Sequence, residues 1–339
     1  MDLIINPFDE SGYDLATMTR AINIIPNTYG RVRQLGLFTA DPVRTRTVIL
    51  DETNGVITLL KSQPVGSPAP KKKHAKAKTR SFIIPHIPYD DVILPSDLQG
   101  HREAGSIDPK ALNTEMTKRL FEMRASHAIT EEYLMVGALK GIILDADGTV
   151  LNNLYDEFGI IMKSITFALA NSATDVTAKC RAVIRHIEDN LLGEVMTGVH
   201  CLCGPTFFDT LISHEKVEKF FLNHAKAIEL AGGGQDPRKG FSFGGITFEE
   251  YRAKASDAEG NVRQFIGDED SHFFPVGTQS TFKIHHAPAN YFETVNTYGL
   301  PLYAKQVMAA NGKRIDVLTE ANPLPLCRRP GLLVKGLIN

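Results

Sequence analysis

The sequence predicts a mixed α+β fold with long segments that lie outside its compact core. Three observations lead to this prediction. Strand-like and helix-like segments follow one another without the strand–helix alternation of a doubly wound sheet. One apolar stripe at helical spacing continues for about 30 residues, far longer than the usual mean of ~11–12. A run of lysines, flanked by prolines and glycines, cannot form a packed core.

The composition argues against several classes of protein. The 339 residues carry 37 Lys and Arg against 39 Asp and Glu, and a formal net charge of −2 is unlike that of a strongly basic nucleic-acid-binding protein. No apolar run reaches the ~18–20 residues that a membrane span needs, and no basic region precedes the first apolar residues as in a signal peptide. Four cysteines are too few for a disulfide framework, which favours free thiols in a reducing cytoplasm.

Residues 1–40 read as an irregular, partly extended arm with one short helix. Leu15, Met18 and Ile22 lie at helical spacing, so the helix is expected between about Tyr13 and Ile22. The arm has no dense apolar pattern and cannot build its own core. We therefore expect it to lie on another surface.

A β-hairpin is expected in residues 43–62. The strand 46–51 is rich in β-branched residues, Asn54-Gly55 is a favoured two-residue turn, and 56–60 returns. The stretch 71–80 that follows contains six Lys or Arg and no acidic residue. We expect it to form a projecting loop. Its cations are Lys71, Lys72, Lys73, Lys76, Lys78 and Arg80.

Three interpretations of this basic stretch remain open. It is a solvated loop, it docks on an acidic patch of a partner, or it contacts DNA directly. Six cations could neutralise several phosphates, but no aromatic residue between positions 71 and 80 is available to stack on bases.

The longest helix is expected at residues 108–139. Asp108 is a good N-cap and Pro109 fits the first helical position. Its apolar stripe makes it a structural spine that packs along one side. The other expected elements are an extended strand at 82–88, a hairpin at 141–151 around Asp147-Gly148, a helix from about Asp175 to Leu192, a strand at 199–202, helical residues 207–230 with a break near Ser213, strands at 241–248 and 262–266, and short C-terminal strands at 315–333.

Asp145 and Asp147 form the sharpest catalytic pattern. The segment 143–150 resembles the nucleophile motif of haloacid-dehalogenase-type phosphatases. In that motif the first aspartate attacks phosphorus, the second acts as acid and base, and a magnesium ion sits on both. Residues 267–270 could supply the later acidic motif. The alternative is a hairpin turn at Asp147-Gly148. We favour the turn, because the motif follows a long helix and Thr149 continues as a strand, with no βαβ unit around it.

Two further patterns give no site. Cys201 and Cys203 have a single spacer residue, whereas structural zinc sites use spacers of two to four residues and a second ligand pair, so buried cysteines are expected. The glycine clusters 232–234 and 244–245 lack the spacing of a phosphate-binding loop. No cofactor or metal is expected, and the chain is interpreted as a non-catalytic assembly subunit.

The chain resembles the major capsid protein E family of tailed bacteriophages, the lambda-like group. The resemblance covers nearly the whole chain and is weakest from about residue 175 to 240. It depends on these strings: 286–291 (HAPANY), 296–305 (NTYGLPLYAK), 320–330 (EANPLPLCRRP), Asn54-Gly55 with its hairpin, 85–87 with 90–91, 97–102 (DLQGHR) and 139–141 (LKG).

The resemblance implies the Hong Kong 97-type capsid fold and a division of the chain into five parts. They are an N-arm (1–42), an extended β-loop that lies over a neighbouring subunit (43–92), a peripheral domain with the spine helix and a β-hairpin (93–159), an axial domain (160–302), and C-terminal strands that return to the peripheral domain (303–339).

The resemblance also implies a function. Pentamers and hexamers of the chain would form the icosahedral head shell, which encloses phage DNA without sequence-specific binding and expands during maturation. The expected location is the virion, with assembly in the host cytoplasm. Scaffold, portal and decoration proteins are candidate partners, and no membrane is involved. Another phage structural or scaffold protein is the nearest alternative.

From the charges we expect the basic stretch to contact acidic residues of a neighbouring subunit. Asp90, Asp91 and residues 268–270 are the candidate partners of its cations.

Overall fold

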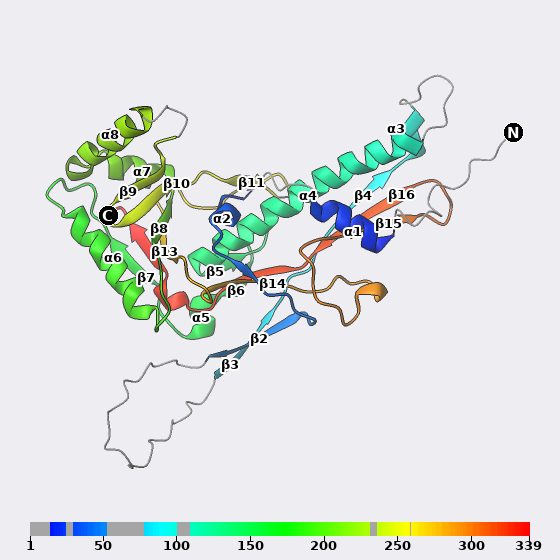
Figure 1. Ribbon diagram of the computed structural model, residues 1–339, viewed down its shortest axis with the longest axis horizontal. Coiled ribbons are helices and arrows are strands. Elements are labelled where there is room, and N and C mark those ends of the chain that lie inside the picture. Colours follow the sequence, from blue (N-terminus) through cyan, green and yellow to red (C-terminus); the bar gives the residue numbers. More distant parts are fainter. Residues whose placement is uncertain (1–13, 25–29, 53–77, 100–108, 231–235, 258) are drawn as a thin grey trace, which may run out of the picture. The chain divides into compact units, whose positions relative to one another are not determined.

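The computed structural model describes residues 14–24, 30–52, 78–99, 109–230, 236–257 and 259–339 (Figure 1). The chain divides into two compact units. Unit 1 combines Met1–Val48, Ile83–Leu134 and Ile284–Pro325, and unit 2 combines Ile49–Phe82, Met135–Lys283 and Leu326–Asn339. Each unit is therefore assembled from segments that lie far apart in the sequence.

Unit 1 is built on a three-stranded antiparallel sheet in the order β15-β16-β4. Helices α1 and α4 contribute Met18, Ile22, Met116, Leu120 and Met123 to the core that covers one face of the sheet. The bounds are α1 Leu15–Ile24, α2 Arg31–Gln34, β1 Thr39–Ala40, β4 Ile87–Ile93, α3 Pro95–Gln99, η2 Phe292–Thr294, β15 Tyr303–Met308 and β16 Ile315–Ala321; α4, Pro109–Lys140, begins in unit 1 and continues into unit 2.

Unit 2 contains a six-stranded mixed sheet in the order β7-β18-β13-β8-β10-β9. Helix α6 packs along β7 and β13, whereas α7 packs along β10 and α8 along β9 (Figure 1). The bounds are β5 Ile142–Leu144, β6 Val150–Asn153, α5 Leu154–Phe158, β7 Lys163–Thr166, α6 Val176–Asn190, β8 Gly198–Cys203, α7 Pro205–Ile212, α8 Glu215–Leu230, β9 Lys239–Phe243, β10 Ile246–Glu250, β11 Lys254–Ser256, β12 Val262–Gln264, β13 Ser271–Val276, η3 Pro330–Leu332 and β18 Val334–Leu337.

Four strands cross the boundaries of the two units. They are β2 Thr47–Glu52, β3 Lys78–Ile83, β14 Phe282–His286 and β17 Pro323–Cys327. Strands β2 and β3 form a two-stranded ribbon, and β14 lies between β1 and β17 in a three-stranded sheet.

Aromatic side chains fill the core of unit 2. The rings of Phe167 and Phe273 stack at 5.5 Å, and the ring of Phe248 meets Phe273 edge-on at 5.9 Å. All three side chains are fully buried. Aromatic pairs of this geometry add about 0.5–1.5 kcal/mol beyond the burial of their area, so this cluster fixes the sheet against the residues that lead into α6.

Most of the expected elements are present. Helix α4 spans 32 residues and matches the expected spine at 108–139. The hairpin around Asp147-Gly148 is formed by β5 and β6, and α6 begins after Asp175, whose side chain accepts from the backbone N–H of Ala178. Within the described residues, no helix is both long and apolar enough to span a bilayer.

Several expectations differ from the structure. The strand expected at 82–88 is the end of β3 and the start of β4, with residues 84–86 between them in no strand. The basic stretch was expected to form a loop over residues 71–80. This is wrong for its last three residues, because β3 begins at Lys78. The strand expected at 241–248 is two strands, β9 and β10, separated by Gly244 and Gly245, both with positive φ. Helix α2 was not expected, since four residues carry too little periodicity to predict a helix. The return strand at 56–60 lies outside the described residues.

Candidate functional site

The basic stretch is described only at its end. Lys71, Lys72, Lys73 and Lys76 lie outside the described residues, and Lys78 is placed as the first residue of β3. Arg80 is the one cation of this set whose side-chain contacts the structure gives. Its Nε donates to the carbonyl of Glu157 at 2.6 Å, and its guanidinium lies 4.4 Å from the ring centroid of Phe158.

These contacts give Arg80 a role within its own unit. Glu157 and Phe158 end helix α5, where unpaired carbonyls carry the negative end of the helix dipole. The ring of Phe82, two residues along β3, stacks on Phe158 at 6.3 Å. Arg80 and Phe82 therefore attach strand β3 to α5. The lysines of the basic stretch are the cations that such contacts do not account for.

The acidic candidates on β4 differ in their partners. Asp91 Oδ2 accepts from Arg119 Nη1 at 3.0 Å, and the same guanidinium donates to Glu115 at 2.9 Å. The side chain of Asp90 is largely exposed. The partial loss of its hydration is the larger cause, and the nearby carboxylates of Asp316 and Glu320 the smaller cause, of a raised pKa of Asp90. Its surroundings therefore favour the approach of a cation, while Asp91 already has one.

The acidic residues 268–270 are also partly occupied. Asp270 Oδ1 lies 2.7 Å from Lys335 Nζ, and Asp268 accepts from the side-chain amide of Gln264. Glu269 is exposed. Of the three, Asp268 and Asp270 hold the loop between β12 and β13 in place.

The two aspartates of the phosphatase-like pattern lie in a turn. Asp147 Oδ1 accepts from the backbone N–H of Thr149 at 2.8 Å and from its hydroxyl at 2.7 Å. Arg263 Nη2 donates to the carbonyl of Asp147 at 2.7 Å. The chain continues into strand β6 and not into a helix, so the interpretation of Asp147-Gly148 as a hairpin turn is confirmed.

The cysteines are structural. Cys180, Cys201, Cys203 and Cys327 are free and buried. Burial raises the pKa of the Cys180 and Cys327 thiols to about 12. In the part of the chain that the structure describes, no group of three or more His, Cys, Asp or Glu side chains is arranged to hold a metal ion.

Sequence reasoning missed a buried carboxylate that joins four segments of unit 1. Glu320, on β16, is only 3% exposed. It accepts from the backbone N–H of Asn290 at 2.9 Å and from Asn322 Nδ2 at 2.8 Å, while His86 Nδ1 lies 3.0 Å away. Arg46 Nη2 reaches it at 3.5 Å. We call these five residues the Glu320 cluster.

No spacing rule could have found the Glu320 cluster, because its members stand at positions 46, 86, 290, 320 and 322. The available signal was the resemblance. The family-typical strings 85–87, 286–291 and 320–330 supply four of its five residues. They meet in space because β16 pairs with β4, with Glu320 opposite Pro88, while the backbone N–H of Ala287 donates to the carbonyl of Asn322 just after β16.

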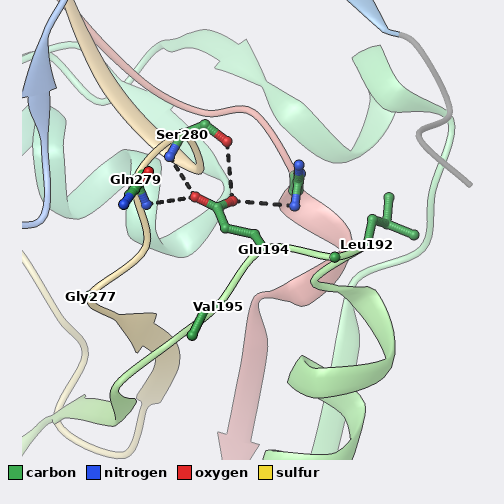
Figure 2. Close-up of a pocket in the computed structure, with 8 residues that line it drawn as sticks. Leu192, Glu194, Val195, Gly277, Gln279 and Ser280 are labelled. Carbon is green, nitrogen blue, oxygen red and sulfur yellow. Dashed lines mark hydrogen bonds and ion pairs between the residues drawn. The ribbon is translucent and has the colours of Figure 1, made fainter. Parts of the chain in front are cut away.

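Unit 2 contains an open pocket of about 510 Å³ between the end of α6 and the loop after β13. Figure 2 shows Glu194 bonded to Gln279 and Ser280 across it. The carboxylate also accepts from Thr281 Oγ1 at 2.7 Å and pairs with Arg329 Nη1 at 3.2 Å. Desolvation opposes the charge of Glu194, but these hydrogen bonds outweigh it and lower its pKa. Its oxygens are thus engaged in holding the loop.

Comparison with known proteins shows which family the sequence matches. The sequence matches the family described as "Phage major capsid protein E" over residues 14–338. It is 30% identical to the major capsid protein of Pseudomonas phage KPP10 over 97% of this chain and 98% of that one. It is also 30% identical to the major capsid protein of Salmonella phage Felix O1, over 96% of each chain.

Solved structures agree on the fold. The asymmetric unit of the mature capsid of bacteriophage PhiM1 aligns with a TM-score of 0.51 at 12% identity, over 100% of this chain and 92% of that one. The fold is therefore the Hong Kong 97-type phage capsid fold that the resemblance implied. No finding supports the phosphatase alternative. The family match and the two full-length relatives show that this chain belongs to the phage major capsid protein E family.

Proposed function

We propose that the chain self-assembles, as pentamers and hexamers, into an icosahedral head shell that encloses phage DNA. The observation that carries this proposal is the alignment with the KPP10 major capsid protein, which leaves almost no part of either chain unmatched. The role is structural, and no reaction is assigned to the chain. Its location is the virion, after assembly in the host cytoplasm.

The proposed parts are the N-arm (1–42), the extended loop (43–92), the peripheral domain (93–159), the axial domain (160–302) and the C-terminal strands (303–339). One observation supports this division, and a second changes its last boundary. Strands β15 and β16 pair with β4, and α4 packs on the same sheet. The last strand, β18, instead pairs with β7 and β13, so the proposed axial domain includes residues 334–337 as well.

Contact between subunits is proposed to involve the basic stretch. Lys71, Lys72, Lys73, Lys76 and Lys78 would face an acidic surface of a neighbouring copy, with Arg80 fixing strand β3 on α5. Asp90 is the best-suited acidic partner among the described candidates. Partial burial, and then the carboxylates around it, raise its pKa, and a cation would relieve the repulsion from those carboxylates. Asp91 contributes indirectly through Arg119.

The shell is proposed to enclose double-stranded DNA without sequence-specific binding. A net charge of −2 fits this role, since a strongly positive inner surface would hold the genome by non-specific attraction. Scaffold, portal and decoration proteins are further proposed partners of the shell.

The proposal is tested by electron microscopy and sedimentation of the purified chain. Closed particles of one diameter, or rings of five and six copies, are expected. The rival structural or scaffold role predicts no closed particle of uniform diameter. A chain that stays at 37.3 kDa at high concentration, even with the other head proteins of its phage present, would contradict the proposal.

A further inference from the structure

The segment between β14 and β15 displays large apolar side chains to solvent. Phe292 is 97% exposed, Val295 62%, Tyr298 56% and Leu300 45%. We call residues 291–300 the apolar loop; it lies within the orange part of the chain in Figure 1. Single exposed apolar residues are normal on a protein surface, but four within nine positions are characteristic of a surface that another molecule covers.

Hydrogen bonds hold the apolar loop in one conformation. Thr294 Oγ1 donates to the carbonyl of Ala289 at 2.6 Å, and Thr297 Oγ1 donates to the carbonyl of Thr294 at 2.7 Å. The backbone N–H of Leu300 donates to the hydroxyl of Tyr303 at 2.9 Å. These bonds order the loop in advance, so a partner would lose little conformational entropy on binding it.

Both ends of the apolar loop are anchored. At the start, the backbone N–H of Asn290 is bound by the buried carboxylate of Glu320. At the end, the N–H of Gly299 donates to the carbonyl of Val43 at 3.0 Å, and a Cβ at this position would lie 2.1 Å from the carbonyl oxygen of His286. The exposed side chains therefore project from a backbone that is fixed on both sides.

The loop carries little unpaired charge. Glu293 is its single ionisable acid, and that carboxylate pairs with Lys305. The guanidinium of Arg44 lies over the ring of Tyr298 at 4.3 Å. A partner that binds this surface would therefore present apolar side chains to it, and would need no large charge of its own at the contact.

We propose that the apolar loop docks on a second copy of this chain. The inference depends on the proposed self-assembly, in which each copy is surrounded by others. The charge of the chain is compatible with a like partner: its net charge is only −2, so two copies repel each other weakly, and the loop itself is nearly neutral. The chain also offers exposed apolar side chains to receive it, for example Ile161 at 95% and Leu230 at 89% exposure.

Substitution of Phe292 separates assembly from folding. Because this side chain is 97% exposed, Phe292→Ser should leave the unfolding midpoint of the dissociated subunit unchanged. Assembly should require a protein concentration higher by about tenfold or more, since a buried aromatic at an interface commonly contributes that much. Phe292→Leu, which keeps an apolar side chain, is the matched control and should assemble at nearly the wild-type concentration.

The partner is identified by photo-crosslinking with p-benzoylphenylalanine at position 292. The expected product is a pair of identical chains, present in particles and absent from dissociated subunits. A cross-link to a different protein, or one confined to a single chain, overturns the inference. So does normal assembly of Phe292→Ser alongside assembling wild-type protein, and that result leaves the proposed function standing. A wild-type chain that never assembles overturns both.

Discussion

The guanidinium of Arg119, on α4, donates to the carboxylate of Asp91, on β4, at 3.0 Å. The same side chain binds Glu115 one helical turn earlier and lies 3.8 Å from Asp97. One cation thus joins the long helix, the strand and helix α3 within unit 1. Its side chain is 27% exposed, so the group is partly screened from water but not fully desolvated.

Replacement of Arg119 by Met should destabilise the dissociated subunit by about 1–2 kcal/mol. The change removes donors from three carboxylates and leaves them close to one another. Arg119→Lys keeps the charge but not the two-pronged geometry and should recover only part of the loss. Urea unfolding of the variants at neutral pH measures the difference. An unchanged free energy of unfolding for Arg119→Met would show that water replaces the guanidinium at no cost.

Reversal of charge in the basic stretch should impair assembly. Lys71→Glu, Lys72→Glu and Lys73→Glu together should lower particle yield or block expansion, because the reversed charges would repel an acidic neighbour. Particle yield by sedimentation and shell diameter by electron microscopy are the measurements. The matched control reverses Lys219, Lys226 and Lys313, which are exposed lysines elsewhere on the described chain.

If Asp90 is the partner, Asp90→Lys in the triple variant should restore part of the particle yield, since the two charges are then exchanged. Equal yields from the triple variant, its control and the wild type would remove the basic stretch from the assembly contacts. A fall in the control as large as in the triple variant would attribute the effect to net charge alone.

Acid should destabilise unit 1 through His127. Burial, with a smaller effect from Arg124, lowers the pKa of this histidine to about 4 from an ordinary 6.5. Its Nε2 lies 2.9 Å from the hydroxyl of Thr319, and the ring of Tyr89 meets it edge-on. As the pH falls below 6.5, the unfolded chain takes up a proton that the folded chain does not, so stability is lost between pH 6.5 and about 4.

His127→Gln removes this proton uptake while keeping a side chain that can bond to Thr319. Between pH 7 and pH 4.5 the variant should lose about 2 kcal/mol less stability than the wild type. Urea unfolding of dissociated subunits at both pH values gives the two differences. Buried His272 and His286, whose pKa values are lowered to about 3 and about 4, are present in both proteins and cancel from the comparison. Parallel pH curves for the two proteins would contradict the assignment to His127.

Gly299→Ala should destabilise unit 1 by about 2–4 kcal/mol, because the new methyl group would overlap the backbone of His286 and Ala287. The change should also loosen the apolar loop, so amide hydrogen exchange in residues 291–300 should become faster. Gly198→Ala is the control. A Cβ there has its nearest neighbour at 3.7 Å, in ordinary contact with Val276, and should be tolerated. Equal thermal midpoints for the two variants would argue against a close contact at Gly299.

The sequence was informative where the signal is local. Asp108-Pro109 and a long apolar stripe predict α4, and Asp147-Gly148 between short apolar runs predicts the β5–β6 turn, because capping and turn formation depend on residues a few positions apart. Gly244 and Gly245 divide an expected strand in two, since both adopt positive φ. The two glycines are evident in the sequence, but only the structure shows that the chain turns there and that β9 and β10 are antiparallel.

The contacts that position the candidate surfaces were not accessible in this way. Arg80 binds at the end of α5, 77 residues further along the chain, and Glu320 collects donors from positions 46, 86 and 290. No periodicity links such positions. Strand pairing brings them together, and it is set by the packing of the whole unit and not by neighbouring residues.

The burial of all four cysteines has a practical consequence. Because every native thiol is shielded, a single cysteine introduced at an exposed position such as Val262, which is 64% exposed, would be the one site that a maleimide reagent reaches in the folded subunit. Each copy in a particle would then carry one attached group at a known place. A chemical group could therefore be attached to each subunit at one chosen position without first replacing the native cysteines.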